Sequence, residues 1–188
     1  MTRIISGIAG GLRLAAPHGS ATRPTSDRVR EALFSRIVSE FGSLEGLRFL
    51  DLYAGSGAVG LEAWSRGAGV VKLVEQDRRT AALISKNAAA IGFPKAKVVA
   101  TSVATFLSSP PTAPYDIVFL DPPYALPDAD VAKDLAMLVD GGRLAAGAMV
   151  IVERSSRSPE PMWPGGIELV REKKYGETRI WYGHATDQ

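Results

Sequence analysis

The amino-acid sequence predicts a doubly wound, Rossmann-like α/β domain, and two observations carry that prediction. From residue 47 onward, apolar strands alternate with helical segments, a pattern typical of a parallel sheet covered on both faces. The first of these strands runs into the glycine-rich turn G-x-G-x-x-G, formed by Gly55, Gly57 and Gly60, before a helix begins. A turn of this spacing between a strand and a helix favours a nucleotide-like ligand. The 188 residues suffice for one such domain with a small appendage.

The appendage is expected at the N-terminus, over residues 1–42. Residues 3–14 alternate imperfectly around a Gly-Gly pair, which suits a short hairpin. Apolar residues then recur at helical spacing from Val29 to Phe41. Thr25 or Ser26 is placed to cap the start of this helix, and Gly42 is placed to end it.

The net positive charge of the chain lies near this end. Residues 1–30 carry five arginines and a single acid, Asp27, whereas the remainder has more acids than bases. A basic end of this kind can be an electrostatic footprint for nucleic acid. A solubilising terminus whose arginines face water is the alternative.

Residues 43–188 are expected to form the main domain. Strands are predicted at 47–52, 70–75, 97–100 and 115–120, alternating with helices at 59–66, 78–91, 103–107 and 131–139. Right-handed crossovers are the rule for such units. A strand at 149–153 follows. Two further strands, at 167–174 and 179–182, are joined at Gly176, so the ending is predicted to be antiparallel.

The composition excludes several classes of site. The chain has no cysteine and two histidines, which removes disulfides, thiolate nucleophiles and clustered zinc ligands, so no metal is expected. No apolar run approaches the roughly 18 residues that span a bilayer, and the N-terminus lacks an apolar signal segment. We therefore expect a cytoplasmic protein with no membrane partner.

The glycine turn and two acidic residues favour S-adenosylmethionine as the ligand. At Gly55 and Gly57 the missing side chain lets the backbone approach a ligand, and Glu75, about twenty residues later, is placed to accept both hydroxyls of a ribose. Dinucleotides share this design, but they need a pyrophosphate at the helix N-terminus. S-adenosylmethionine instead has an amino group that suits a carboxylate, which Asp51 could supply directly or through water. A ligand-free turn, with Asp51 as a helix or loop cap, is the structural alternative.

A second motif, Asp121-Pro122-Pro123-Tyr124, follows the strand at 115–120. Ligands of open α/β sheets bind beyond the carboxyl ends of strands where the winding reverses, so the two motifs are expected to face one another. The prolines fix the backbone, and the Pro122 carbonyl and Asp121 carboxylate can hold both hydrogens of an exocyclic amine. The amine's lone pair would then aim at a sulfonium methyl, with Tyr124 stacked on the base. A rigid turn, with Asp121 as a cap and Tyr124 as a packing residue, is the alternative.

Taken together, these segments resemble the RsmD family of bacterial 16S rRNA (guanine-N2)-methyltransferases. The resemblance covers nearly the whole chain and is most specific in Arg23-Pro-Thr-Ser-Asp-Arg-Val-Arg-Glu-Ala-Leu-Phe. It also includes Arg3-Ile-Ile-Ser-Gly, Asp51-Leu-Tyr-Ala-Gly-Ser-Gly-Ala-Val-Gly-Leu-Glu-Ala and Phe119-Leu-Asp-Pro-Pro-Tyr. It implies a class I S-adenosylmethionine-dependent methyltransferase sheet with an antiparallel C-terminal hairpin and a small N-terminal hairpin-plus-helix extension.

The resemblance also implies which residues form the site. The residues that would present the guanine amine are Asp121, Pro122, Pro123 and Tyr124. Those that would hold S-adenosylmethionine, and its product S-adenosylhomocysteine, are Asp51, Tyr53, Ala54, Gly55, Ser56, Gly57, Glu75, Gln76, Ser102, Val103 and Asp121. Those of the basic extension that would grip RNA or close over the cofactor are Arg3, Arg13, Arg23, Thr25, Arg28 and Arg30. Where the family has an acid for the adenine amino group, this chain has Ser102, whose hydroxyl accepts a hydrogen bond without charge.

The expected substrate is 16S rRNA, within the small ribosomal subunit or a late assembly particle, and the expected state is a monomer. Methylation of adenine N6 in DNA or RNA uses the same kind of amine-holding motif and is the enzymatic alternative, although 188 residues show no added DNA-recognition domain. A dinucleotide-dependent oxidoreductase would need phosphate contacts and a proton donor that the sequence does not show. A non-catalytic RNA-binding protein is the remaining alternative.

Overall fold

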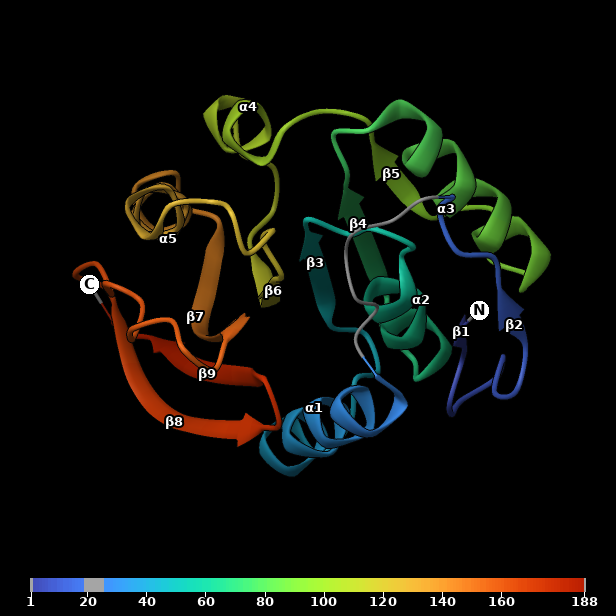
Figure 1. Ribbon diagram of the computed structural model, residues 1–188, viewed down its shortest axis with the longest axis horizontal. Coiled ribbons are helices and arrows are strands. Elements are labelled where there is room, and N and C mark those ends of the chain that lie inside the picture. The colour runs from blue at the N-terminus through green and yellow to red at the C-terminus, as the bar shows by residue number, and fades with distance from the viewer. Residues whose placement is uncertain (1, 19–25, 188) are drawn as a thin grey trace. The chain divides into compact units, whose positions relative to one another are not determined.

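The chain divides into two compact units, which meet in the sequence between Thr101 and Ser102. The computed structural model describes residues 2–18 and 26–187 (Figure 1). The predicted RNA contacts Arg23 and Thr25 lie outside the described residues. Each unit has its own helices, strands and buried apolar side chains.

The first unit begins with the predicted hairpin and helix. Strand β1 (Thr2–Arg3) pairs antiparallel with β2 (Arg13–Leu14), so the hairpin is confirmed, with strands of two residues each. Helix α1 (Asp27–Phe41) follows, and the Ser26 side chain caps its first turn. The helix ends at Gly42, whose φ of 82° favours glycine because other side chains are strained there.

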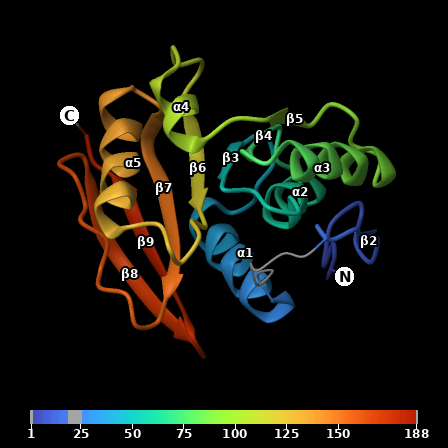
Figure 2. The ribbon, with the colours of Figure 1, turned by 45° about the horizontal axis from the view of Figure 1, so that its top comes forward.

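Three parallel strands in the order β5-β4-β3 form the core of the first unit. Their bounds are β3 (Arg48–Leu52), β4 (Val70–Val74) and β5 (Lys97–Val99). Helix α2 (Ala58–Ser65) packs on β3 and β4, and α3 (Arg78–Ala90) packs on β5 (Figure 2). Because parallel strands end at a shared edge, the glycine turn after β3 and Glu75 after β4 come together there.

The second unit continues the alternating pattern and adds the antiparallel ending. Its helices are α4 (Val103–Ser108) and α5 (Asp128–Asp140), and its strands are β6 (Tyr115–Leu120), β7 (Leu144–Ser155), β8 (Ile167–Tyr175) and β9 (Thr178–Ala185). Strands β6 and β7 pair in parallel, and β9 pairs antiparallel with both β7 and β8. The predicted antiparallel ending is therefore confirmed.

Strand β7 begins at Leu144, five positions before the predicted start at Met149. Its first four residues are partly or fully exposed, and Gly147 has a φ of 71°, whereas residues 149–152 are fully buried. Periodicity in a sequence reports burial, so the exposed start of a strand leaves no apolar pattern to detect.

Candidate functional site

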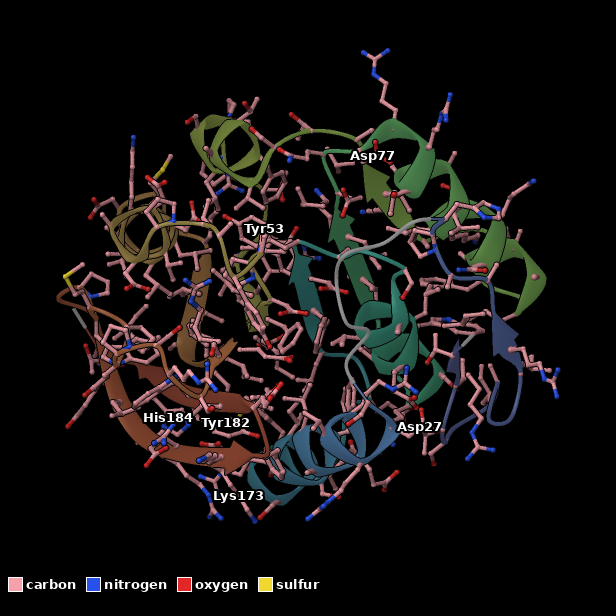
Figure 3. The ribbon with its side chains drawn as sticks, viewed as in Figure 1. Asp27, Tyr53, Asp77, Lys173, Tyr182 and His184 are labelled. Atoms are coloured by element: carbon pink, nitrogen blue, oxygen red, sulfur yellow. The ribbon has the colours of Figure 1, made fainter. Side chains whose placement is uncertain are left out.

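The glycine turn joins β3 to α2 in a strained conformation. Tyr53, directly after β3, has a φ of 61° and is the only non-glycine residue with a positive φ in the part of the chain that the structure describes (Figure 3). Gly55 and Gly57 follow at 58° and 81°. Ala54 and Gly57 close the turn, since the Gly57 N–H donates to the Ala54 carbonyl at 2.9 Å. A bulky residue at positive φ is costly and persists mainly where function requires that conformation.

Glu75 ties this turn to the end of β4. One oxygen of its half-buried carboxylate accepts from the Gly55 N–H at 3.0 Å, and the other accepts from the Asp77 N–H at 2.8 Å. A carboxylate offers about four lone-pair positions, so each oxygen can accept a further hydrogen bond. A Cβ added at Gly55 would meet no atom within 4 Å, so the space beside the turn is open. These features fit a ribose that donates its hydroxyls to Glu75. The next residue, Gln76, is exposed.

Asp51 lies beneath the turn rather than at its surface. It is 1% exposed, and its Oδ2 accepts from the Gly60 N–H at 2.9 Å in the first turn of α2. Burial raises the pKa of this carboxyl well above its ordinary value; the Gly60 hydrogen bond opposes that shift, and the charge of Glu75 adds to it. A Cβ at Gly60 would lie 2.6 Å from Leu73 Cδ2 and 3.1 Å from Asp51 Oδ2, so a larger residue would have to displace these buried side chains. Asp51 therefore accepts from the first turn of α2 as a helix cap does, which is the structural alternative to cofactor binding for this residue.

Replacing Asp51 with asparagine is expected to raise thermal stability, and the gain should grow with pH. The amide oxygen still accepts from the Gly60 N–H, but the variant has no buried carboxyl to ionise. A carboxyl whose pKa is raised by folding stabilises the folded state fully only below its unfolded pKa, about 3.9, and this contribution is lost as pH rises through the folded pKa. Thermal melts of the cofactor-free proteins from acid to neutral pH should therefore show a widening gap.

Asp77→Asn is the control of opposite sign. Asp77 caps α3, and its exposed carboxylate accepts from the Thr80 hydroxyl at 2.7 Å and from the Thr80 N–H at 2.9 Å, which lowers its pKa (Figure 3). A depressed pKa contributes stability that is present above the unfolded pKa and lost as pH falls through the folded one. The Asp77→Asn variant should be less stable than the parent at neutral pH, with a deficit that shrinks in acid. If both variants changed in the same direction with pH, the account of Asp51 would be wrong.

The second unit begins with the residues predicted at the adenine side. Ser102 caps α4: its hydroxyl accepts from the Thr105 N–H at 3.1 Å and donates to Thr105 Oγ1 at 2.8 Å. The hydroxyl is engaged within its own helix, but one of its two lone pairs remains for an amino group. Val103 is 4% exposed and its side chain is part of the core, so a ligand could meet only its backbone.

The Asp-Pro-Pro-Tyr motif follows β6 directly. Asp121 is half-buried and Pro122 is buried, whereas 52% of Tyr124 is exposed. The Leu126 N–H donates to the Pro123 carbonyl at 2.9 Å, which closes a turn around Tyr124. An aromatic ring that is half exposed at the end of a buried strand is available to stack on a base.

Arg154 of β7 holds this turn, although the sequence does not single it out. The residue is 3% exposed, and its guanidinium donates to the carbonyls of Pro123 and Leu126 and pairs with Asp128. Its only sequence signal is a position shortly after a run of buried apolar residues. Two of its three partners are backbone carbonyls, which every residue possesses, so the side-chain pattern carries no sign of the contact.

The sequence predicts that Arg30 binds RNA, and the structure shows that this prediction is wrong. Its side chain has no exposed surface, so a phosphate cannot reach it. Nε lies 3.6 Å from Glu62 Oε1, and a terminal nitrogen lies 3.0 Å from Asp27 Oδ1. The same guanidinium donates to the Thr2 hydroxyl and the Arg3 carbonyl. Burial lowers the pKa of Arg30, and the charges of Glu62 and Asp27 oppose this shift. The number of arginines in the sequence does not reveal that Arg30 forms a buried ion pair with Glu62 of α2.

Three other predicted RNA contacts are accessible. Arg13 and Arg28 are exposed. The Arg3 side chain is 63% exposed, although its Nε lies 3.2 Å from Asp27 Oδ2. An exposed ion pair is worth at most about 1 kcal/mol, so a phosphate can compete with Asp27 for this guanidinium.

Three polar side chains of α2 and α3 hold the N-terminal segment that carries Arg3 and Arg13; we call Glu62, Ser65 and Asn87 the N-terminal clasp. Glu62 accepts from two backbone N–H groups at 2.8 and 3.1 Å, and Ser65 accepts from a third at 2.9 Å. Asn87 both accepts from and donates to one residue of the segment, and it also donates to the Ser56 carbonyl in the glycine turn at 3.2 Å. The partners in the segment are Ile5, Ser6, Ala9 and Ala15.

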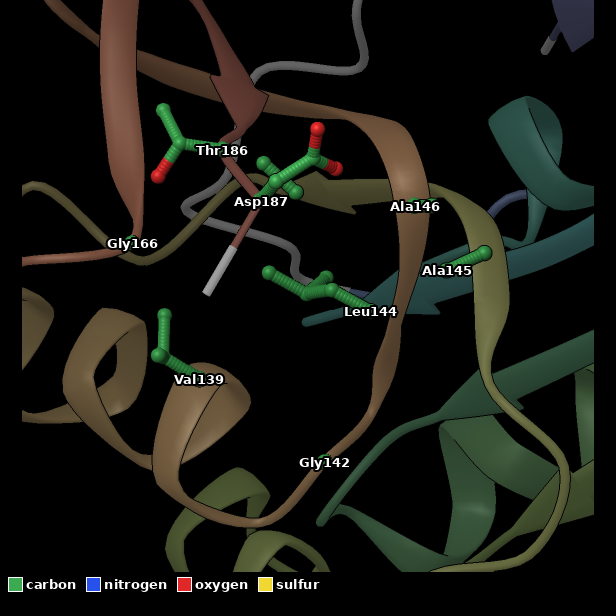
Figure 4. A pocket seen from close by; sticks show the side chains of 9 residues that line it. Val139, Gly142, Leu144, Ala145, Ala146, Gly166, Thr186 and Asp187 are labelled. Atoms are coloured by element: carbon green, nitrogen blue, oxygen red, sulfur yellow. The ribbon is translucent and has the colours of Figure 1, made fainter.

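A pocket of about 460 Å³ lies elsewhere in the second unit, lined by residues that include Val139, Leu144 and Thr186 (Figure 4). It contains none of the predicted site residues. Within residues 2–18 and 26–187, no cluster of three or more His, Cys, Asp or Glu side chains is placed to bind a metal ion. In the same ranges, no helix has the length and apolar character needed to cross a membrane.

Comparison with known proteins places these features in a family. The sequence profile of the family described as Conserved hypothetical protein 95 matches residues 2–184. Ribosomal RNA small subunit methyltransferase D of Escherichia coli (strain K12) is 38% identical over 175 residues, which are 93% of this chain and 85% of that protein. Among solved structures, yhhF from Escherichia coli is 34% identical with a TM-score of 0.87, over 99% of this chain and 98% of that one.

A more distant structure supports the fold alone. Magnesium protoporphyrin IX methyltransferase from Synechocystis, solved with bound SAM, is 12% identical with a TM-score of 0.66, over 85% of this chain and 79% of that one. The predicted α/β methyltransferase fold, with parallel strands followed by an antiparallel ending, is confirmed by these likenesses together with the strand pairings.

Proposed function

We propose that this chain, which belongs to the Conserved hypothetical protein 95 family, the RsmD family, is an S-adenosylmethionine-dependent methyltransferase that modifies the N2 amine of a guanine in 16S rRNA. The family match over residues 2–184 and the identity of 38% to a ribosomal RNA small subunit methyltransferase support the rRNA substrate. The turn of residues 121–124 supports the reaction. It presents a half-buried carboxylate and a half-exposed aromatic ring directly after a buried strand.

In this proposal, two sets of residues bind the cofactor and the amine. Glu75 accepts the ribose hydroxyls, and the open backbone at Gly55 lets the cofactor approach. S-adenosylmethionine supplies, when bound, a methyl group on a positively charged sulfur. Asp121 accepts one hydrogen of the guanine amine and the Pro122 carbonyl accepts the other, which fixes the direction of the nitrogen lone pair that receives the methyl group. Tyr124 stacks on the base and keeps it in the plane that this geometry needs.

Guanine N2 is a weak nucleophile because its lone pair is delocalised into the ring. Asp121 therefore contributes by orienting and polarising the amine. Adenine N6 has the same weakness and the same pair of hydrogens, so an amine-holding turn could serve either base. The identity of the methylated nucleoside is consequently the decisive measurement.

Methyl-labelled S-adenosylmethionine, incubated with the protein and either naked 16S rRNA or small-subunit particles that lack the modification, tests the proposal. Digestion of the RNA should place the label in N2-methylguanine. Label in N6-methyladenine would overturn the substrate amine. Cofactor binding without any transfer would favour a non-catalytic RNA-binding protein. The better of the two substrates would show whether the enzyme recognises folded RNA alone or an assembled particle.

We further propose that residues 1–42 form an RNA-binding extension on a methyltransferase domain of residues 43–188, and that the enzyme acts as a monomer in the cytoplasm. Arg3, Arg13 and Arg28 are the exposed arginines among the described residues of this extension, and we propose that they contact phosphates. The small ribosomal subunit, or a late assembly particle, is the proposed form of the substrate.

Replacing Arg13 and Arg28 with alanine is expected to weaken RNA binding and its dependence on salt. Each phosphate contact that is lost should flatten the slope of log K against log salt by roughly 0.7 to 0.9. Lys133→Ala is the matched control, because Lys133 is an exposed base on α5, outside the extension. Binding isotherms at several salt concentrations measure the slope. An unchanged slope in the double variant would identify these arginines as solubilising residues.

A further inference from the structure

The pairing of β6 with β7 places Arg154 beside the turn that carries Tyr124. Leu120, the last residue of β6, pairs with Val152 of β7. Strand β7 continues to Ser155, so Arg154 is two positions beyond that pair. Since side chains alternate along a strand, Arg154 lies on the same face as Val152. Because β7 extends past the end of β6, Arg154 lies next to the point at which the chain leaves β6.

The guanidinium of Arg154 clamps both ends of the turn. Nη1 donates to the Pro123 carbonyl at 3.1 Å, and Nη2 donates to the Leu126 carbonyl at 2.9 Å. Nη2 also lies 3.2 Å from Oδ1 of Asp128, the first residue of α5. The arginine side chain is only 4% exposed, so this carboxylate balances a charge that water does not cover. Tyr124 lies between the two clamped carbonyls.

The two hydrogen bonds restrain the backbone on both sides of Tyr124. Half of the surface of Tyr124 is exposed, so packing alone restrains it little. The planar guanidinium holds its N–H groups in a fixed fork, which suits two carbonyls at a defined separation, whereas a lysine ammonium would reach one of them. We infer that Arg154 is a positioning residue for the guanine-binding turn, an inference that rests on the proposed function of that turn. It acts through the backbone of residues 123–126 and does not touch the substrate.

Arg154→Lys tests this inference because it keeps the charge but cannot bridge both carbonyls. The matched control is Arg143→Lys. Arg143 is 2% exposed in the same unit, and it also donates to two backbone carbonyls, those of Phe106 and Ser109, which lie outside the motif. The rate of methyl transfer at saturating RNA and cofactor should fall about 10- to 100-fold in Arg154→Lys, because small displacements of reacting groups have effects of this size. The dissociation constant of S-adenosylmethionine should stay unchanged.

The control separates positioning from a general loss of stability. Arg143→Lys should lower the melting temperature and yet retain the wild-type rate. If the two variants lost rate in proportion to their melting temperatures, Arg154 would be a structural residue only. An unchanged rate in Arg154→Lys would also overturn the inference.

Backbone amide exchange gives a readout that does not depend on activity. The Leu126 N–H, which donates to the Pro123 carbonyl, should exchange faster in Arg154→Lys, whereas the amides of β9 should not change. Unchanged exchange at Leu126 would overturn the clamp. If the wild-type protein transferred no methyl group to guanine while Leu126 exchanged faster in the variant, the proposed function would fail but the ordering of the turn by Arg154 would stand.

Discussion

Replacing Asp121 with alanine is expected to lower the rate of methyl transfer at saturating substrates by at least about a hundredfold, with a much smaller effect on cofactor affinity. The carboxylate is proposed to accept one hydrogen of the guanine amine, and without it the amine can rotate so that its lone pair leaves the line of transfer. The contacts proposed for the cofactor, at Glu75 and the glycine turn, stay in place. Rapid-quench transfer and calorimetric titration of S-adenosylmethionine measure the two quantities.

Two further variants define the role of Asp121. Asp130→Asn, at an exposed position early in α5, is the control and should keep the wild-type rate. Asp121→Asn keeps the size and one acceptor oxygen, so its rate should lie between those of the parent and the alanine variant. Equal losses of rate and of cofactor affinity in Asp121→Ala would reject the proposed role and assign the residue to cofactor binding.

Replacing Glu62 with alanine is expected to lower the free energy of unfolding by about 3–5 kcal/mol, because Arg30 and Arg66 lose the buried carboxylate that they share. The Glu62 carboxylate is fully buried and lies 3.6 Å from the guanidinium of Arg30 and 3.0 Å from that of Arg66. It also accepts from the N–H groups of Ile5 and Ser6. Removing it therefore affects both the packing of α1 and the attachment of the N-terminal segment. Urea unfolding followed by circular dichroism measures the change.

Arg30 and Arg28 form a matched pair for this experiment, since both lie on α1 and only Arg30 is buried. Arg30→Ala should be destabilising, whereas Arg28→Ala should change stability by at most about 0.5 kcal/mol. Because Arg30 and Glu62 interact directly, the double variant should lose less than the sum of the single losses. If Glu62→Ala proved as mild as Arg28→Ala, the buried network would contribute nothing to stability.

Most of the fold could be predicted because burial leaves a periodic trace in the sequence. Strands β3, β4 and β6 are runs of mostly buried side chains and lie within one residue of their predicted positions. Strand β7 was predicted to start late because its first residues are exposed. Exposed and buried parts of a strand differ in this respect because hydrogen bonds to the neighbouring strand define both, but only burial selects apolar residues.

Parts of the candidate site could be found because their signals are local. Gly55 and Gly57 are marked by the backbone conformations they must adopt, and the Asp-Pro-Pro-Tyr turn is marked by its prolines. The roles of Arg30 and Arg154 could not be found in this way. Each depends on partners that folding brings from elsewhere, which for Arg30 include the Glu62 carboxylate and for Arg154 include two backbone carbonyls.

The N-terminal clasp imposes an order of events on the newly made chain. Residues 5–15 leave the ribosome well before the side chains that accept their N–H groups, which lie between 56 and 72 positions later in the sequence. Contacts of such long separation form late, and two-residue strands give the segment little structure of its own in the meantime. A segment that is made before its partners is therefore among the last parts of the first unit to dock. A chain interrupted before Glu62 would lack the whole clasp and would display Arg3 and Arg13 on an unanchored tail, whereas a chain that includes Asn87 has all three side chains that hold the segment.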